Sequence, residues 1–243
     1  MNRDFDTATV GEIVTSDFRA AAVFERFSID FCCGGKRSLA DACVTAQADR
    51  VAVLDALRVA TSDAAAPGDA DAARWSVDRL IDHIVDTHHA YVRASLPRIA
   101  QHLEKLVSAH GERHPELTGV AAAFAEVAAE LAQHMMKEEQ ILFPYVRDLA
   151  EHAALRPCGG LVSPFGTIEN PIRMMEREHR DAGDGLQSIR TLTRGYTTPD
   201  DGCRTYRVTM EELAEFERDL HRHIHLENNI LFPEAIALER RFA

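Results

Sequence analysis

The chain has 243 residues, of which 46% are hydrophobic and 7% aromatic, and a formal net charge of −12. This composition is ordinary for a globular protein, and the strong negative charge argues against a nucleic-acid groove or an anionic membrane surface as a partner. We expect a cytoplasmic protein, because there is no signal-peptide pattern, no apolar run of ~18 residues, and an odd number of cysteines, five.

Residues 1–60 predict a small helical N-terminal domain. Apolar residues recur at helical spacing in 10–14, 18–27, 38–46 and 50–60, and the sequence Cys-Cys-Gly-Gly at 32–35 interrupts them. Residues 61–75 have almost nothing to bury and contain a Pro-Gly pair, so we interpret them as a linker.

Residues 76–243 predict four long helices, over about 76–109, 115–151, 170–195 and 204–239. Short loops that contain Gly or Pro separate them. Four long helices joined in this way favour an all-α fold, an antiparallel four-helix bundle.

The second and fourth of these helices carry the same motif, H-x3-E-x2-I-L-F-P. It begins at His134 with Glu138 in one copy, and at His223 with Glu227 in the other. Residues four apart share one face of a helix, so each copy directs an imidazole and a carboxylate to the same side.

The two halves of this region repeat, which predicts further partners on the first and third helices. His89 precedes His134 by 45 residues and His179 precedes His223 by 44, whereas His88 would give 46 and is the weaker candidate. On adjacent antiparallel helices these residues lie at one level of the bundle. We therefore expect six residues to converge: His89, His134, Glu138, His179, His223 and Glu227.

Four imidazoles and two carboxylates favour two metal ions. Each ion would take two histidines, and both glutamates would bridge them. Our preference is two iron ions with an oxo or hydroxo bridge. One alternative is a set of structural polar residues without metal, at a desolvation cost of several kcal/mol each. Another is a ferritin-like site, since Glu176 and His179 form a Glu-x-x-His motif.

Other charged residues near this layer are candidates to orient the ligands. Glu130 and Asp219 precede His134 and His223 by one turn, and Glu178 adjoins His179. Exposed residues with no such role are an equal alternative for Glu130 and Asp219. His221 and His225 point away from His223 around the helix, so we expect them at the surface.

The adjacent thiols Cys32 and Cys33 allow two interpretations. They could act in redox exchange or metal hand-off, or they could be two reduced thiols in a tight turn. Cys43, Cys158 and Cys203 are isolated in the sequence, and we expect no role for them.

Four segments resemble one known family. They are Phe-Cys-Cys-Gly-Gly-Lys at 31–36, the H-x3-E segment at 134–144, Met-Glu-x-Glu-His at 175–179 and Leu-Glu-Asn-Asn-x-Leu-Phe-Pro at 226–233. They are similar to the iron–sulfur cluster repair (repair of iron centres) proteins, which join an ScdA-type N-terminal domain to a hemerythrin-like bundle.

The resemblance implies a di-iron centre held by the same six residues. It also implies a role under nitrosative and oxidative stress, in which the protein repairs damaged iron–sulfur proteins or binds nitric oxide, as a homodimer. Two rival hypotheses are a di-iron nitric-oxide reductase, and a stoichiometric scavenger or sensor of nitric oxide or O2.

Overall fold

The computed structural model describes residues 5, 7–62, 69–155 and 163–241, and this part of the chain is helical with no β-strand. The predicted all-α class is confirmed. None of the helices in the described ranges is long and apolar enough to span a bilayer. Of the expected linker, residues 63–68 lie outside the described residues, and Asp69–Arg74 form a short 3-10 helix, η1. Cys158, in the loop after the second long helix, also lies outside the described residues.

Contacts between Cα atoms divide the chain into two compact units. The first comprises 1–81, 149–161 and 222–243, and the second comprises 82–148 and 162–221. The boundaries at 81, 148 and 221 fall inside helical segments.

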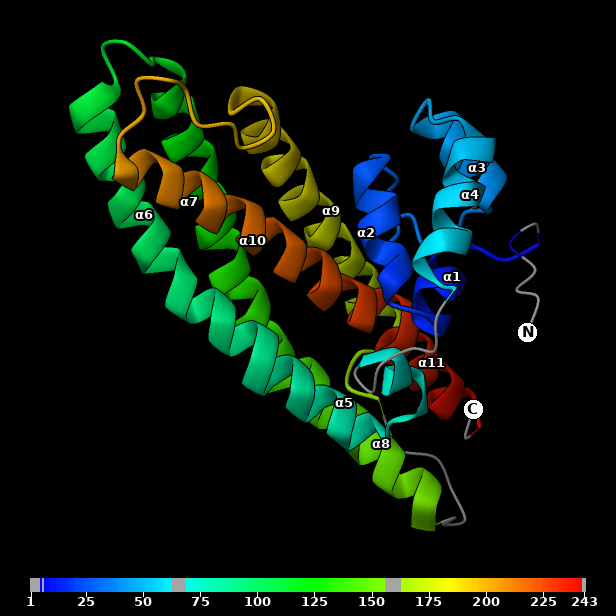
Figure 1. Ribbon diagram of the computed structural model, residues 1–243. Coiled ribbons are helices and arrows are strands. Elements are labelled where there is room, and N and C mark those ends of the chain that lie inside the picture. The colour runs from blue at the N-terminus through cyan, green and yellow to red at the C-terminus, as the bar shows by residue number, and fades with distance from the viewer. Residues whose placement is uncertain (1–4, 6, 63–68, 156–162, 242–243) are drawn as a thin grey trace. The chain divides into compact units, whose positions relative to one another are not determined.

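The second unit is the four-helix bundle that the sequence predicts. Its long helices are α6 (Ala90–His110), α7 (Glu116–Lys137), α9 (Glu169–Leu192) and α10 (Arg204–Leu226), which belongs to this unit up to His221 (Figure 1). Helix α7 packs against both α6 and α9. Helix α10 is tied to α6 by His102 Nδ1 and Glu212 Oε2, 2.7 Å apart, and to α9 by Arg190 and Glu217. Short turns join α6 to α7 and α9 to α10, which gives an antiparallel bundle.

The first unit contains the N-terminal helices α1 (Val10–Ser16), α2 (Arg19–Arg26), α3 (Leu39–Thr45) and α4 (Arg50–Ala60). Thr9 and Glu12 form a capping box at α1, and Ser38 and Asp49 cap α3 and α4. In the same unit, α1 packs against the turn η4 (Glu227–Leu231), which precedes the last helix, α11 (Phe232–Arg240).

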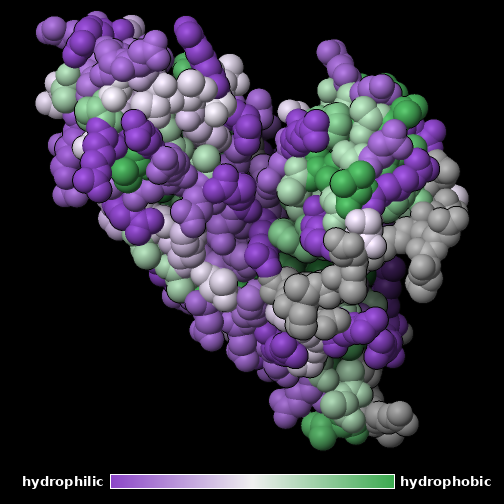
Figure 2. Space-filling model, viewed as in Figure 1, coloured by the Kyte–Doolittle hydropathy of each residue, from purple (hydrophilic) through white to green (hydrophobic). Residues whose placement is uncertain are grey.

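The surface of α3 and α4 is unusually apolar. Val44, Val51 and Val59 are all exposed. Figure 2 shows hydrophobic surface over this part of the chain and mainly hydrophilic surface over the long helices. The hydrophilic surface is expected for helices that bury one apolar stripe and hydrate the other side.

The predicted helices are not α-helical throughout, because each segment that carries a predicted metal ligand, except α9, contains a π-helical turn. Helix α5 (Val77–His83) passes through η2 (Ile84–His89) into α6, α7 passes through η3 (Glu138–Leu142) into α8 (Phe143–Leu155), and α10 passes through η4 into α11. Sequence periodicity alone missed these turns.

Two prolines explain two of the π turns. Pro144 and Pro233 have no N–H, and a proline ring also clashes with the carbonyl four residues earlier. The helix widens instead: Phe143 N–H donates to Glu138 C=O, and Phe232 N–H donates to Glu227 C=O, each five residues back. The shared I-L-F-P ending therefore places a π turn at each glutamate of the repeated motif.

Candidate metal centre

Four of the six predicted ligands belong to the bundle unit, and all four are buried. His89 ends η2, His134 lies in the last turn of α7, Glu138 begins η3, and His179 lies in the middle of α9. None of them is more than 2% exposed. Buried histidine and carboxylate side chains need charged or polar partners to offset their desolvation.

The ring nitrogens and one carboxylate oxygen converge. His134 Nε2 lies 3.0 Å from His179 Nε2. Glu138 Oε2 lies 3.3 Å from His134 Nε2 and 3.4 Å from His89 Nε2. The Nε2 atoms of His89 and His134 thus face one carboxylate, and that of His179 faces Nε2 of His134, so these atoms are close enough to be ligands of a cation.

The remaining pair belongs to the first unit. His223 lies near the end of α10, and Glu227 opens η4. Both side chains are fully buried, and His223 Nε2 lies 3.0 Å from Glu227 Oε1. The two copies of the motif therefore have the same local geometry.

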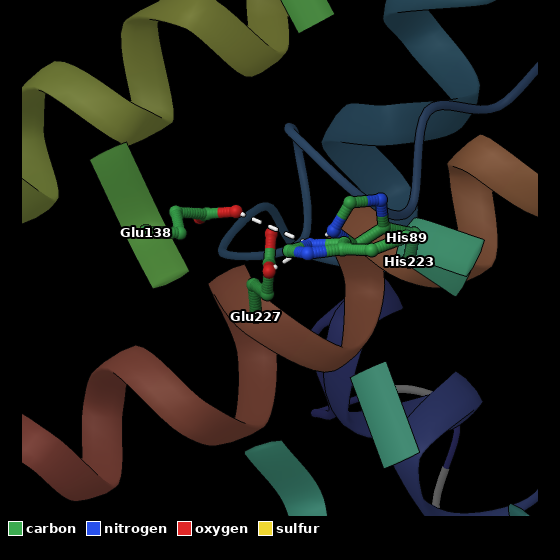
Figure 3. A group of neighbouring side chains, drawn as sticks. All are labelled: His89, Glu138, His223 and Glu227. Carbon is green, nitrogen blue, oxygen red and sulfur yellow. Dashed lines mark hydrogen bonds and ion pairs between the residues drawn. The ribbon is translucent and has the colours of Figure 1, made fainter. Parts of the chain in front are cut away.

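The six residues fall into two groups whose ligand atoms lie within 4.8 Å of one another. One group is His89, Glu138, His223 and Glu227, and the other is His134, Glu138, His179 and Glu227. Figure 3 shows the carboxylates of the first group pointing toward its imidazoles. Glu138 and Glu227 are common to both groups. Imidazole and carboxylate donors without thiolate fit iron and similar transition metals.

Two further carboxylates contact the Nδ1 atoms of two of these histidine rings. Glu139 Oε1 lies 2.6 Å from His89 Nδ1, and Glu178 Oε2 lies 3.0 Å from His134 Nδ1. A carboxylate that accepts from Nδ1–H leaves Nε2 available to a metal.

The charge of these carboxylates is stabilised by their partners. The hydrogen bond with His134 lowers the pKa of Glu178 to about 2, with help from Lys137 and against the effect of burial. Burial raises the pKa of Glu139, but its hydrogen bonds with His89 and Arg93 outweigh this and lower it overall. Both groups are therefore ionised at neutral pH.

Comparison with known proteins identifies the chain. Residues 80–235 match the hemerythrin HHE cation binding domain, and residues 6–61 match the ScdA N-terminal domain, a domain of unknown function. The iron–sulfur cluster repair protein YtfE of Musicola paradisiaca is 38% identical over 229 residues, which is 94% of this chain and 96% of the relative. The probable iron–sulfur cluster repair protein of Haemophilus influenzae is 34% identical over 96% of this chain and 98% of its own length.

The chain belongs to the iron–sulfur cluster repair protein family. The resemblance of its sequence motifs to this family is confirmed, and a cation-binding hemerythrin-like domain is shown. The two His and Glu groups could hold a metal ion in this domain.

The residues predicted to orient the ligands lie in different places. Glu178 contacts His134, as above. Glu130 is exposed on α7, and its side chain makes no hydrogen bond in the described part of the chain. Asp219 Oδ1 lies 2.9 Å from His88 Nδ1. Sequence reasoning missed Glu139, although its position directly after Glu138 in the motif was a usable signal.

The surface position predicted for His225 is wrong, since this side chain is only 1% exposed. It packs between the rings of Phe18 and Phe31, and burial, followed by the charge of Arg222, lowers its pKa to about 4. The N-terminal helices of the same unit cover this side of α10, which the periodicity of α10 cannot reveal. His221 is half-buried, contrary to expectation.

The cysteine loop is ordered around Asp30. Asp30 Oδ1 accepts the backbone N–H groups of Cys32 and Cys33, and it lies 3.4 Å from Cys32 Sγ. Cys32 is buried and Cys33 half-buried, and both are reduced. A hydrogen bond with Cys33, burial and the charge of Asp30 raise the pKa of Cys32 well above its ordinary value. The ligand atoms of the three residues lie within 4.8 Å of one another.

Asn229 fixes this loop to the chain just after Glu227. Its Nδ2 donates to the carbonyl oxygens of Phe31 and Cys32, at 3.3 and 3.2 Å. A Cβ on Gly35 would lie 2.1 Å from Asn229 Oδ1, so glycine is required for this approach. The thiols are therefore attached to the helix turn that carries one predicted ligand.

Proposed function

We propose that this protein holds two iron ions and uses them to repair damaged iron–sulfur clusters under nitrosative and oxidative stress. One observation carries the proposal: two buried groups of ligands share Glu138 and Glu227, in a member of the cluster repair family.

In this proposal, His89 and His223 would hold one ion, and His134 and His179 would hold the other. Glu138 and Glu227, which are common to both groups, would be ligands of both. The donor set supports iron, since four imidazoles and two carboxylates suit a borderline cation, and a single ion would leave half of the nitrogen donors unused. When bound, the ions supply redox-active positions for a small ligand such as nitric oxide, and a source of iron.

The surrounding residues keep the ligands in place. Glu139 and Glu178 fix the rings of His89 and His134 by accepting from Nδ1, and the ligands are shielded from water by burial. Fixed ligands need little reorganisation when an ion enters.

Cys32 and Cys33 are proposed to assist the transfer of iron. The support is chemical: Asp30, Cys32 and Cys33 offer two thiols and a carboxylate close together, and thiolates bind iron. The raised pKa of Cys32 keeps it protonated until a metal or partner displaces the proton.

The wider assignments are also proposals. Residues 1–60 would act as the transfer domain, 61–75 as its linker and 76–243 as the metal-binding domain, in a cytoplasmic homodimer whose targets are damaged iron–sulfur proteins. The match of residues 6–61 and 80–235 to separate domains supports this division.

A reconstitution assay tests the proposal. A cluster-containing dehydratase is inactivated with nitric oxide without oxygen, and the iron-loaded protein is added. We expect dehydratase activity to return. The variant Glu138→Leu should not restore it, and Cys32→Ser/Cys33→Ser should restore it more slowly. No recovery with fully loaded protein would refute repair.

Nitric oxide titration separates the rival functions. Nitric oxide is added to the reduced protein, and nitrous oxide is measured. Nitrous oxide produced over many equivalents without dehydratase recovery would favour a reductase. Uptake that saturates at one or two equivalents per protein, again without recovery, would favour a scavenger or sensor.

A further inference from the structure

A second pair of reactive groups lies at the far end of the bundle unit. His110 ends α6, and Cys203 directly precedes α10. His110 follows His89 by 21 residues on one continuous helical segment, which corresponds to about 31 Å. This pair is therefore remote from the candidate metal ligands of the same unit.

The geometry of the pair is that of a thiol and its base. His110 Nε2 lies 3.3 Å from Cys203 Sγ. Cys203 is exposed, whereas His110 is only 7% exposed. In cysteine enzymes and redox proteins, a histidine in this position accepts the thiol proton and leaves the nucleophilic thiolate.

Aromatic packing fixes the ring of His110. The Tyr206 ring meets it edge-on at 5.6 Å, and the His114 ring lies 6.3 Å away. His114 is itself held by Asp201, whose Oδ1 lies 2.9 Å from His114 Nε2. The surrounding rings therefore hold the His110 imidazole in the orientation that places Nε2 beside the sulfur.

The backbone places the thiol at the positive end of a helix. The carbonyl of Cys203 accepts the N–H of Arg207, so Cys203 is the N-cap of α10. The sulfur of Cys203 therefore lies beside the partial positive charge that the N-terminus of a helix carries. Capping alone does not account for a cysteine, because serine, threonine, aspartate and asparagine cap helices better.

We propose that Cys203 is a modification site that forms mixed disulfides with low-molecular-weight disulfides, with His110 as its base. His110 takes the thiol proton, the Cys203 thiolate attacks one sulfur of the disulfide, and the S–S bond breaks. One new S–S bond forms at Cys203, and the other half leaves as a thiolate that takes the proton from His110. The disulfide is the only oxidant required.

The experiment uses the full-length protein and oxidised glutathione. Samples are quenched with acid at intervals, and modified cysteines are mapped by mass spectrometry of peptides. Oxidised glutathione should modify Cys203 faster than it modifies Cys43. It should also react with Cys203 faster than it exchanges with free reduced glutathione. The variant His110→Gln should slow modification of Cys203 by about tenfold or more.

Controls separate this role from a structural one. His102→Gln removes another partly buried histidine of α6 and should leave the Cys203 rate unchanged. Iodoacetamide alkylation of Cys203 should show the same loss in His110→Gln, with helix content unchanged by circular dichroism. A His110→Gln rate within about twofold of the parent, or a Cys203 rate no faster than that of free glutathione, would overturn the proposal.

Discussion

His223 Nε2 lies 3.0 Å from Glu227 Oε1, and both side chains are fully buried. The equivalent atoms of His134 and Glu138 are 3.3 Å apart in the other copy of the motif. A carboxylate with no exposure is costly unless a cation offsets its desolvation. The repeated pair could therefore hold a cation, which would offset the desolvation of its carboxylate.

Removing one shared carboxylate should impair both metal positions. In Glu227→Leu we expect iron content to fall by more than half after reconstitution, because Glu227 is common to both groups. Iron per protein is measured by plasma emission spectroscopy. Glu234→Gln, at an exposed position on α11, is the control and should bind as the parent does. If Glu227→Leu bound as much iron as the parent protein, Glu227 could not be a ligand shared by the two metal positions.

Glu178 should tune affinity without being a ligand. Glu178→Gln removes the charged acceptor at His134 Nδ1, and metal affinity should fall by about 10- to 100-fold. Competition with a chelator measures this. Glu130→Gln, on the exposed side of α7, is the matched control and should have no effect. The prediction fails if the two variants release iron alike.

The two adjacent cysteines should differ in reactivity. The pKa of Cys32 is raised, so its nucleophilic thiolate forms only in more alkaline solution than for an ordinary cysteine. At about pH 8, iodoacetamide should therefore alkylate Cys33 well before Cys32. The rate at Cys32 should rise with pH. Peptide mass spectrometry assigns the sites, and equal rates at about pH 8 would be inconsistent with this account.

One ion pair, between the partly exposed Arg190 and the buried Glu217, should contribute to the stability of the bundle unit. Arg190 Nε lies 3.0 and 3.1 Å from the two oxygens of Glu217, and Glu217 is nearly inaccessible to solvent. Arg190→Met leaves this carboxylate buried without its cation. We expect a loss of about 3 kcal/mol in the free energy of unfolding of the metal-free protein.

Denaturation with urea measures that loss. The double variant Arg190→Met/Glu217→Met removes the stranded charge as well and should recover most of the stability. If both variants lose the same free energy, packing rather than charge would explain the effect.

The helices and the six residues of the two groups could be predicted from the sequence because both depend on local spacing. The internal repeat alone selects His89 and His179 as partners of the two H-x3-E copies. Contacts between distant segments could not be predicted in this way. The burial of His225 depends on helices some 200 residues earlier, and Cys203 was expected to be isolated because His110 is 93 residues away in sequence.

The π turns had a signal that regular periodicity obscured. In a continuous helix, buried positions alternate between steps of three and four. Around each glutamate one series of buried positions takes three steps of four, through His134, Glu138, Leu142 and Val146, and again through His223, Glu227, Leu231 and Ala235, although other residues between them are buried as well. Such a run marks a helix that is locally wider than 3.6 residues per turn.

The π turns also determine what could be moved into another protein. Each adds one residue, so the helix beyond it is rotated by about 100° from where a regular helix would continue. A designer who copied only the histidine and glutamate into a regular bundle would obtain two ligands followed by a helix with its polar side toward the core. The segment to transplant is 134–144 or 223–233, with its proline, because the ligands and the phase of the following helix are encoded together.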